Sequence, residues 1–72
     1  MKSAKETDIR VNGEPVQGAE GMSLAELLIR LGEPADRVAT ALNGSFVARH
    51  SRDDVQLAGG DRITVFKAIV GG

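Results

Sequence analysis

The side chains that could do chemistry in this chain are few, and their spacing favours neither a catalytic site nor a metal site. His50 is the only histidine and stands in a polar stretch beside Arg49 and Ser51. A general base needs a positioned partner and a substrate within reach, so we interpret His50 as solvent-facing. The pair Asp53-Asp54 lacks the further oxygen ligands at regular spacing that a calcium loop supplies. One histidine and no cysteine exclude an ordinary zinc site in this chain.

The paired glycines Gly59-Gly60 lack the spacing of a phosphate-binding loop. Such loops follow GxxxxGK[ST] or GxGxxG patterns and open a helix, whereas Gly59-Gly60-Asp61 precedes a run of strand-forming residues. No GxSxG nucleophile elbow occurs either. We therefore interpret these glycines as a turn, and no side chain is left as a candidate for covalent chemistry.

One other functional group is the α-carboxylate that follows KAIVGG, residues 67–72. A carboxylate becomes an acyl donor only after its oxygen is activated, for example as an acyl-adenylate that a partner enzyme makes with ATP. Glycine has no side chain to obstruct a narrow active site, and the tail from Lys67 could reach about 15–20 Å at roughly 3.3 Å per residue. We predict that Gly72 is modified at its carboxylate and that a partner's channel receives Ala68, Ile69, Val70 and Gly71.

The boundary between fold and tail is predicted at Lys67. Ala68 and Ile69 have an equally good alternative role as a continuation of the last strand, and Val70 a weaker one, because termini pack less well near the free end. We divide the chain into a disordered lead-in (residues 1–8), one domain (residues 9–67) and a flexible tail (residues 68–72).

Composition excludes several classes of function. The chain has 72 residues, enough for one core but not for a deep substrate pocket, which argues against a self-contained enzyme. Nine basic and ten acidic residues are interspersed, and there is no Trp or Tyr, so a nucleic-acid surface is not expected. No apolar run approaches the roughly 18–20 residues of a membrane helix, and MKSAKETD is no signal peptide. A cytoplasmic protein without membrane contact is the expectation.

One amphipathic helix is predicted over residues 23–34. Ser23 and Glu26 fit a capping box, and Gly32 followed by Pro34 fits a helix end. The residues at i, i+3, i+4 and i+7 form one apolar stripe: Leu24, Leu27, Leu28 and Leu31.

Strand-like patterns of period two flank this helix. Asn12-Gly13 and Asn43-Gly44 each separate two apolar stretches, and Asn-Gly tolerates the positive φ angles of a two-residue hairpin turn. Residues 62–67 are rich in β-branched residues and predict a last strand.

The segment between the second hairpin and the last strand is predicted to be short and partly helical. Residues 51–54 fit one helical turn capped by Ser51, after which Val55 and Leu57 return to the core. The predicted order is β-β-α-β-β-β, an α+β fold in which the first and last strands are central neighbours and the helix packs across one face.

The combination of these segments resembles a known family. Their order and spacing over residues 9–72, ending on Gly-Gly, are similar to the ThiS family, the sulfur carriers of thiamine biosynthesis. The segments that carry the resemblance are residues 11–15, 24–28, 41–44, 46–47 with Arg49, 60–63 and 71–72. The lead-in of residues 1–8 and Val70, where a smaller residue is common, depart from the family pattern.

The resemblance implies a ubiquitin-like β-grasp fold with a mixed sheet of about five strands. It also implies that an E1-like adenylating enzyme of the ThiF type uses Mg-ATP to form an acyl-adenylate at Gly72. A sulfur donor enzyme then gives a thiocarboxylate, from which thiazole synthase of the ThiG type receives sulfur. The chain itself would bind no cofactor, since ATP and magnesium belong to the partner, and it would act as a recycled cosubstrate rather than an enzyme.

Two other functions remain open at this point. The small subunit of molybdopterin synthase shares the implied fold and a Gly-Gly end, but its aromatic-rich first strand and late proline pair have no counterpart in this sequence. A β-grasp module that binds partners through its sheet face and never reacts at its end is the other alternative, because a fold alone does not fix a function.

Overall fold

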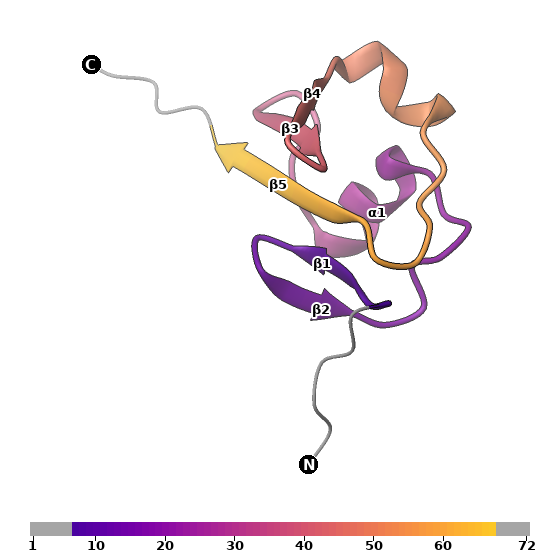
Figure 1. Ribbon diagram of the computed structural model, residues 1–72. Helices are drawn as coiled ribbons and strands as arrows, with labels where there is room; N and C mark the ends of the chain where they lie inside the picture. Colours follow the sequence, from indigo (N-terminus) through magenta and orange to yellow (C-terminus); the bar gives the residue numbers. More distant parts are fainter. Residues whose placement is uncertain (1–6, 68–72) are drawn as a thin grey trace.

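The computed structural model describes residues 7–67 and folds them into a five-stranded mixed sheet with one α-helix and one 3₁₀ helix (Figure 1). This arrangement confirms the predicted α+β class and element order. Along the chain the elements are β1 (Ile9–Val11), β2 (Glu14–Val16), α1 (Leu24–Leu31), β3 (Val38–Leu42), β4 (Ser45–Val47), η1 (Arg49–Asp54) and β5 (Arg62–Lys67).

Both predicted hairpins form, and both turn at Asn-Gly. β1 pairs antiparallel with β2, and β3 pairs antiparallel with β4. Asn12 and Asn43 have φ angles of 52° and 50°, and the glycines that follow them have 87° and 86°. Two consecutive positive φ angles define the turn whose twist matches that of the flanking strands, which explains why this dipeptide stands at both turns.

The strand order in the sheet is β2-β1-β5-β3-β4, so the last strand lies at the centre. β5 runs parallel to β1, with Arg10 opposite Arg62 and Val11 opposite Ile63, and antiparallel to β3. The prediction that the first and last strands are central neighbours is confirmed. This order, with one helix across the sheet, is the ubiquitin-like β-grasp arrangement.

The ends of α1 are set by the residues that the sequence indicated. The hydroxyl of Ser23 accepts a hydrogen bond from the Glu26 N–H at 3.0 Å, and the Glu26 carboxylate accepts one from the Ser23 N–H at 2.9 Å. Gly32 ends the helix in the left-handed conformation with φ 74°. Leu31, the last residue of the predicted apolar stripe, is 38% exposed, whereas Leu24, Leu27 and Leu28 are buried; the helix ends at Leu31.

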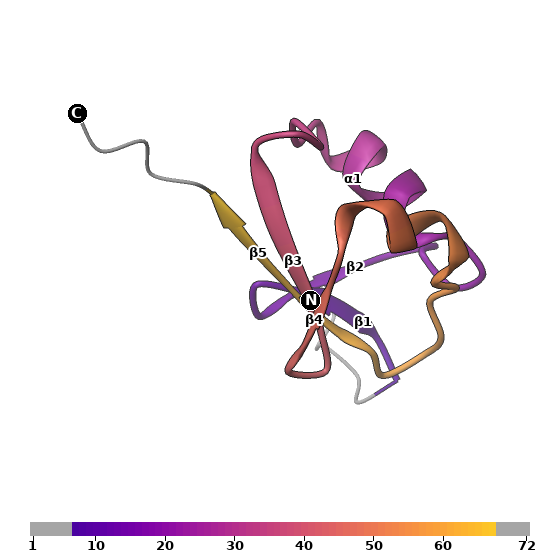
Figure 2. The same ribbon diagram turned by 90° about the horizontal axis from the view of Figure 1, so that it is seen from above.

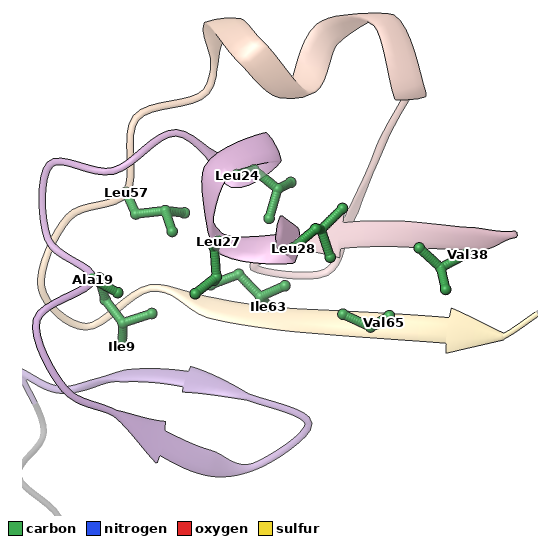
Figure 3. Close-up of a cluster of buried hydrophobic side chains, with 9 residues drawn as sticks. All are labelled: Ile9, Ala19, Leu24, Leu27, Leu28, Val38, Leu57, Ile63 and Val65. Carbon is green, nitrogen blue, oxygen red and sulfur yellow. The ribbon is translucent and has the colours of Figure 1, made fainter. Parts of the chain in front are cut away.

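The core lies between the sheet and the helical layer. Figure 3 shows Leu24, Leu27 and Leu28 of α1 above β5, with Ile63 beneath the helix and Val65 farther along the strand, near Val38. α1 and η1 lie on the same side of the sheet, so the opposite sheet face has no helix over it (Figure 2). The other members of the buried cluster are Ile9, Ala19, Val38 and Leu57.

The segment after β4 differs from its prediction. The expected turn of residues 51–54 is a 3₁₀ helix that begins two residues earlier, and its N-cap is Ala48, which makes no side-chain cap. The predicted cap by Ser51 is therefore wrong. Val55 and Leu57 do return to the core, the first partly buried and the second fully buried.

A buried arginine holds η1 to the rest of the fold. Arg52 is 3% exposed, and its guanidinium donates hydrogen bonds to three acceptors. Nε donates to the Thr40 hydroxyl at 3.1 Å, Nη1 to the Ala35 carbonyl at 2.8 Å and Nη2 to the Val38 carbonyl at 2.7 Å. Burial, and secondly the nearby charge of Arg49, lower the pKa of Arg52. The planar guanidinium thus ties η1 to β3 and to the loop before β3.

Candidate functional site

The residues predicted to react or to enter a partner, Gly72 and residues 68–71, lie outside the described residues. What the structure describes of this site is its base, the end of β5. Of the other candidates, His50 and Asp53-Asp54 are exposed on η1. In residues 7–67 there is no group of three or more His, Asp or Glu side chains that could hold a metal ion. No helix within this part of the chain has the length and apolarity that crossing a membrane requires.

β5 extends past β1 toward the C-terminal end, whereas β3 pairs with it as far as Lys67. β1 pairs with β5 only as far as Val11 opposite Ile63, and β3 begins at Val38, opposite Lys67. Both views of the ribbon show the arrowhead of β5 leaving the body of the domain (Figures 1 and 2). Lys67, where the boundary was predicted, is also the last residue that the structure describes, so the division itself stays a prediction.

Asn12 extends the ladder between β1 and β5 with its side chain. Its backbone N–H donates to the Ile63 carbonyl at 2.9 Å. Its side-chain Oδ1 then accepts from the Val65 N–H at 2.9 Å, and Nδ2 donates to the Val65 carbonyl at 3.4 Å. The amide group thus supplies one donor and one acceptor, as the next residue of a strand would. The last two hydrogen bonds described on this side of β5 are therefore both made by the Asn12 side chain.

The backbone of Lys67 is directed to this same side. Successive residues of a strand turn their N–H and C=O groups to alternate sides. Ile63 and Val65 bond toward β1 and Asn12, so Lys67 also faces that way, and within residues 7–67 the pairing there ends at Val65. The Lys67 ammonium lies 3.8 Å from Glu33 Oε1, and both groups are solvent-accessible, which makes this a weak surface ion pair.

We expect Asn12→Gly to release the end of β5. Glycine keeps the positive φ angle of the turn but removes both side-chain hydrogen bonds, so the Val65 amide loses its protection against hydrogen exchange. The unfolding free energy should fall by about 1–3 kcal/mol, as for a partly buried backbone group left unpaired.

Asn43→Gly is the matched control for this variant. Asn43 occupies the same turn position, but its Oδ1 accepts from the Arg62 N–H at 2.9 Å, at the start of β5. This variant should leave the Val65 amide protected and expose the Arg62 amide. Equal protection of Val65 in both variants would show that the Asn12 amide does not hold the end of the strand.

The sheet face without a helix carries two exposed aromatic rings. Phe46 is 72% exposed and Phe66 is 54% exposed, although both are large apolar residues. Ala39 lies opposite Phe66 and Ala41 lies opposite Phe46 in the strand register, so small side chains stand beside the rings. We call this surface the open face. By the alternation of side chains along each strand its residues are Arg10, Pro15, Ala39, Ala41, Phe46, Arg62, Thr64 and Phe66.

Sequence reasoning missed the open face, although part of its signal is local. In residues 62–67 the apolar Ile63 and Val65 alternate with Arg62, Thr64 and Phe66, which assigns Phe66 to the side opposite the core. Only one helix long enough to cover a sheet was predicted, so one face had to remain open. The exposure of Phe46 could not be found in this way, because a strand of three residues shows too little alternation.

Comparisons with known proteins agree with the fold. The sequence model of the ThiS family matches residues 9–72. A crystal structure of thiamine biosynthesis protein ThiS from Geobacter metallireducens has a TM-score of 0.76 at 34% identity, covering 90% of this chain and 99% of that one.

A solution NMR structure of a thiamine biosynthesis protein from the same organism has a TM-score of 0.71 at 35% identity, covering 90% of this chain and 86% of that one. No match was found among curated proteins. On the family match and the two similar structures, this chain belongs to the ThiS family.

Proposed function

We propose that this protein is a sulfur carrier of thiamine biosynthesis whose reactive group is the carboxylate of Gly72. The observation that carries the proposal is the family match, which extends over residues 9–72 and so includes Gly71 and Gly72. The similar structures from Geobacter metallireducens are proteins of thiamine biosynthesis, which favours the same pathway for this chain.

The proposed chemistry takes place in two steps on an E1-like adenylating partner of the ThiF type. An oxygen of the Gly72 carboxylate attacks the α-phosphorus of ATP, an O–P bond forms, and pyrophosphate leaves. A sulfur nucleophile then attacks the carbonyl carbon, and AMP leaves with the electron pair of the C–O bond. With hydrosulfide the product is the thiocarboxylate and a proton; with a persulfide donor it is an acyl disulfide, which a second thiol must cleave.

In this scheme the chain is a cosubstrate, and the partners supply the catalytic groups. Mg-ATP is bound by the adenylating enzyme, the sulfur comes from a donor enzyme, and a thiazole synthase of the ThiG type receives it. The described part of the chain is suited to presenting a tail, because β5 extends past β1 and Asn12 fixes the strand at Val65, just before Lys67.

The open face is the surface that we propose to dock on the adenylating enzyme. It carries Phe46 and Phe66, and Phe66 directly precedes the last described residue, Lys67. Gly72 is six residues after Phe66, so its carboxylate can lie at most about 20 Å from the ring's backbone. Exposed aromatic side chains at this distance can fix the body of the carrier while the end of the chain enters the partner's site.

A growth requirement tests the pathway. A strain that lacks this chain should require thiazole and grow without any molybdopterin supplement, and the intact gene should restore growth. A variant truncated after Lys67 serves as the control, because it keeps all described elements but has no Gly72. A requirement for molybdopterin in place of thiazole would assign the chain to the other carrier class.

A further inference from the structure

Two arginines lie side by side on the open face. Arg10 of β1 and Arg62 of β5 are partners in the parallel register, so their backbones are about 4.8 Å apart. Ile9, Val11 and Ile63 point into the core, and the alternation of the strands directs both arginines to the opposite face. Like charges directly opposite each other on neighbouring strands destabilise a sheet. The fold therefore carries a charge pair that does not help it.

Neither guanidinium is neutralised within the described part of the chain. Arg10 Nη1 reaches only the Gly13 carbonyl, at 3.5 Å, and residues 7–67 contain no salt bridge of either arginine. The eight strand residues of the open face include two arginines and no acidic residue. The open face is thus positively charged at one end, while the chain as a whole has a net charge of −1.

The charged end and the apolar end of this face are arranged along β5. Arg62 and Phe66 are four residues apart on one strand, or about 13 Å. The arginines lie at the end farther from the tail, and Phe66 lies next to its base. Aromatic residues and arginine, with few lysines, are the composition of the buried centre of protein interfaces.

We propose that Arg10 and Arg62 pair with carboxylates of the protein that adenylates Gly72, beside an apolar patch of that protein that covers Phe46 and Phe66. The inference rests on the proposed function and adds the chemistry of the partner's surface. A second copy of this chain does not fit as the occupant, because the strand residues of its open face include no carboxylate that could pair with the arginines. A polyanion such as nucleic acid does not fit either, because the chain is acidic overall and the face is half apolar.

Association kinetics with the purified adenylating partner test this inference. Arg62→Glu should lower the association rate constant about tenfold at low salt, and Arg62→Gln should lower it less. Raising the salt concentration should lower the association rate constant of the wild type and reduce the difference between the wild type and the Arg62 variants. Arg49→Glu is the matched control: it makes the same charge change on η1, which lies on the other side of the sheet, and should change the rate by about twofold or less.

The variants separate a local contact from general steering. Equal effects of Arg62→Glu and Arg49→Glu would overturn the inference, and so would an unchanged rate for Arg62→Glu. Two further outcomes would assign the open face to another occupant and so overturn the inference. One is that the wild type forms dimers that Arg62→Glu dissociates, and the other is that it binds nucleic acid through Arg62. If the wild type is never adenylated, the proposed function fails together with the inference; if it is adenylated and Arg62→Glu associates normally, only the inference fails.

Discussion

Replacing Gly72 by tryptophan should abolish thiocarboxylate formation and leave the stability of the domain unchanged. In the proposed function the reacting carbon belongs to Gly72 itself, so a bulky side chain on this residue would crowd the carbon that the sulfur nucleophile must attack. The described elements end with β5 at Lys67, and glycine contributes no side chain to any core. The unfolding free energy should therefore stay within about 0.5 kcal/mol of the wild type, as for substitutions away from packed sites.

Gly72→Ala gives the graded version of this result. One methyl group displaces the reacting carbon by about an ångström in a close-fitting site, and such a misplacement can slow a reaction about a hundredfold. The rate of pyrophosphate release and the melting temperature should be measured on the same samples. A clear loss of stability in either variant would show that Gly72 belongs to the fold, and undiminished activation would show that its carboxylate is not the reacting group.

Arg52→Met should destabilise the domain more than any surface substitution. The variant leaves the carbonyls of Ala35 and Val38 without their hydrogen-bond donor. Both are backbone groups, so no substitution can remove these unpaired acceptors. Removing one partner of a buried charged hydrogen bond costs the desolvation of the groups left behind. We expect a loss of about 3 kcal/mol, or a melting temperature lower by about 12–24 °C at this chain length.

Arg49→Met is the control for this variant. It removes the same side chain from the same 3₁₀ helix, but Arg49 is exposed, and its charge only helps to lower the pKa of Arg52. Arg49→Met should change the unfolding free energy by no more than about 0.5 kcal/mol. The stability of Arg52→Lys should lie between those of Arg52→Met and Arg49→Met. An ammonium keeps the charge but cannot reach three acceptors spread around a planar group. Equal melting temperatures of Arg52→Met and Arg49→Met would contradict the role assigned to the buried guanidinium.

The parts of the fold that the sequence predicted are those with local signals. The capping box of Ser23 and Glu26 spans four residues, and each Asn-Gly turn spans two, so these features are decided by neighbours in the chain. The pairing of β1 with β5 followed from a topological argument. All of them are confirmed by the structure.

The features that were missed depend on contacts between distant residues. The three acceptors of Arg52 are 12 to 17 residues away, and arginine is usually exposed, so nothing local indicated its burial. Asn12 was predicted only as a turn residue, yet its amide binds Val65, 53 residues along the chain. The exposure of Leu31 was not indicated either, because apolar periodicity continues to the end of a helix even where the core does not.

The candidate site was predicted by elimination and by resemblance. The absence of a side-chain site left the carboxylate of Gly72, and the family match supports the same end of the chain. The surface proposed to dock on the partner was not predicted, because exposure of Phe46 and the pairing of Arg10 with Arg62 depend on the order of strands in the sheet.

Intact-mass spectrometry after incubation with the adenylating partner, Mg-ATP and a sulfur donor tests the central claim most directly. The proposed function predicts that the mass rises by the difference between one sulfur and one oxygen atom, and that fragmentation places the change on Gly72. A sample without ATP should keep its original mass. An unchanged mass with all components present, or a sulfur located elsewhere in the chain, would contradict the assignment of Gly72 as the sulfur-carrying residue.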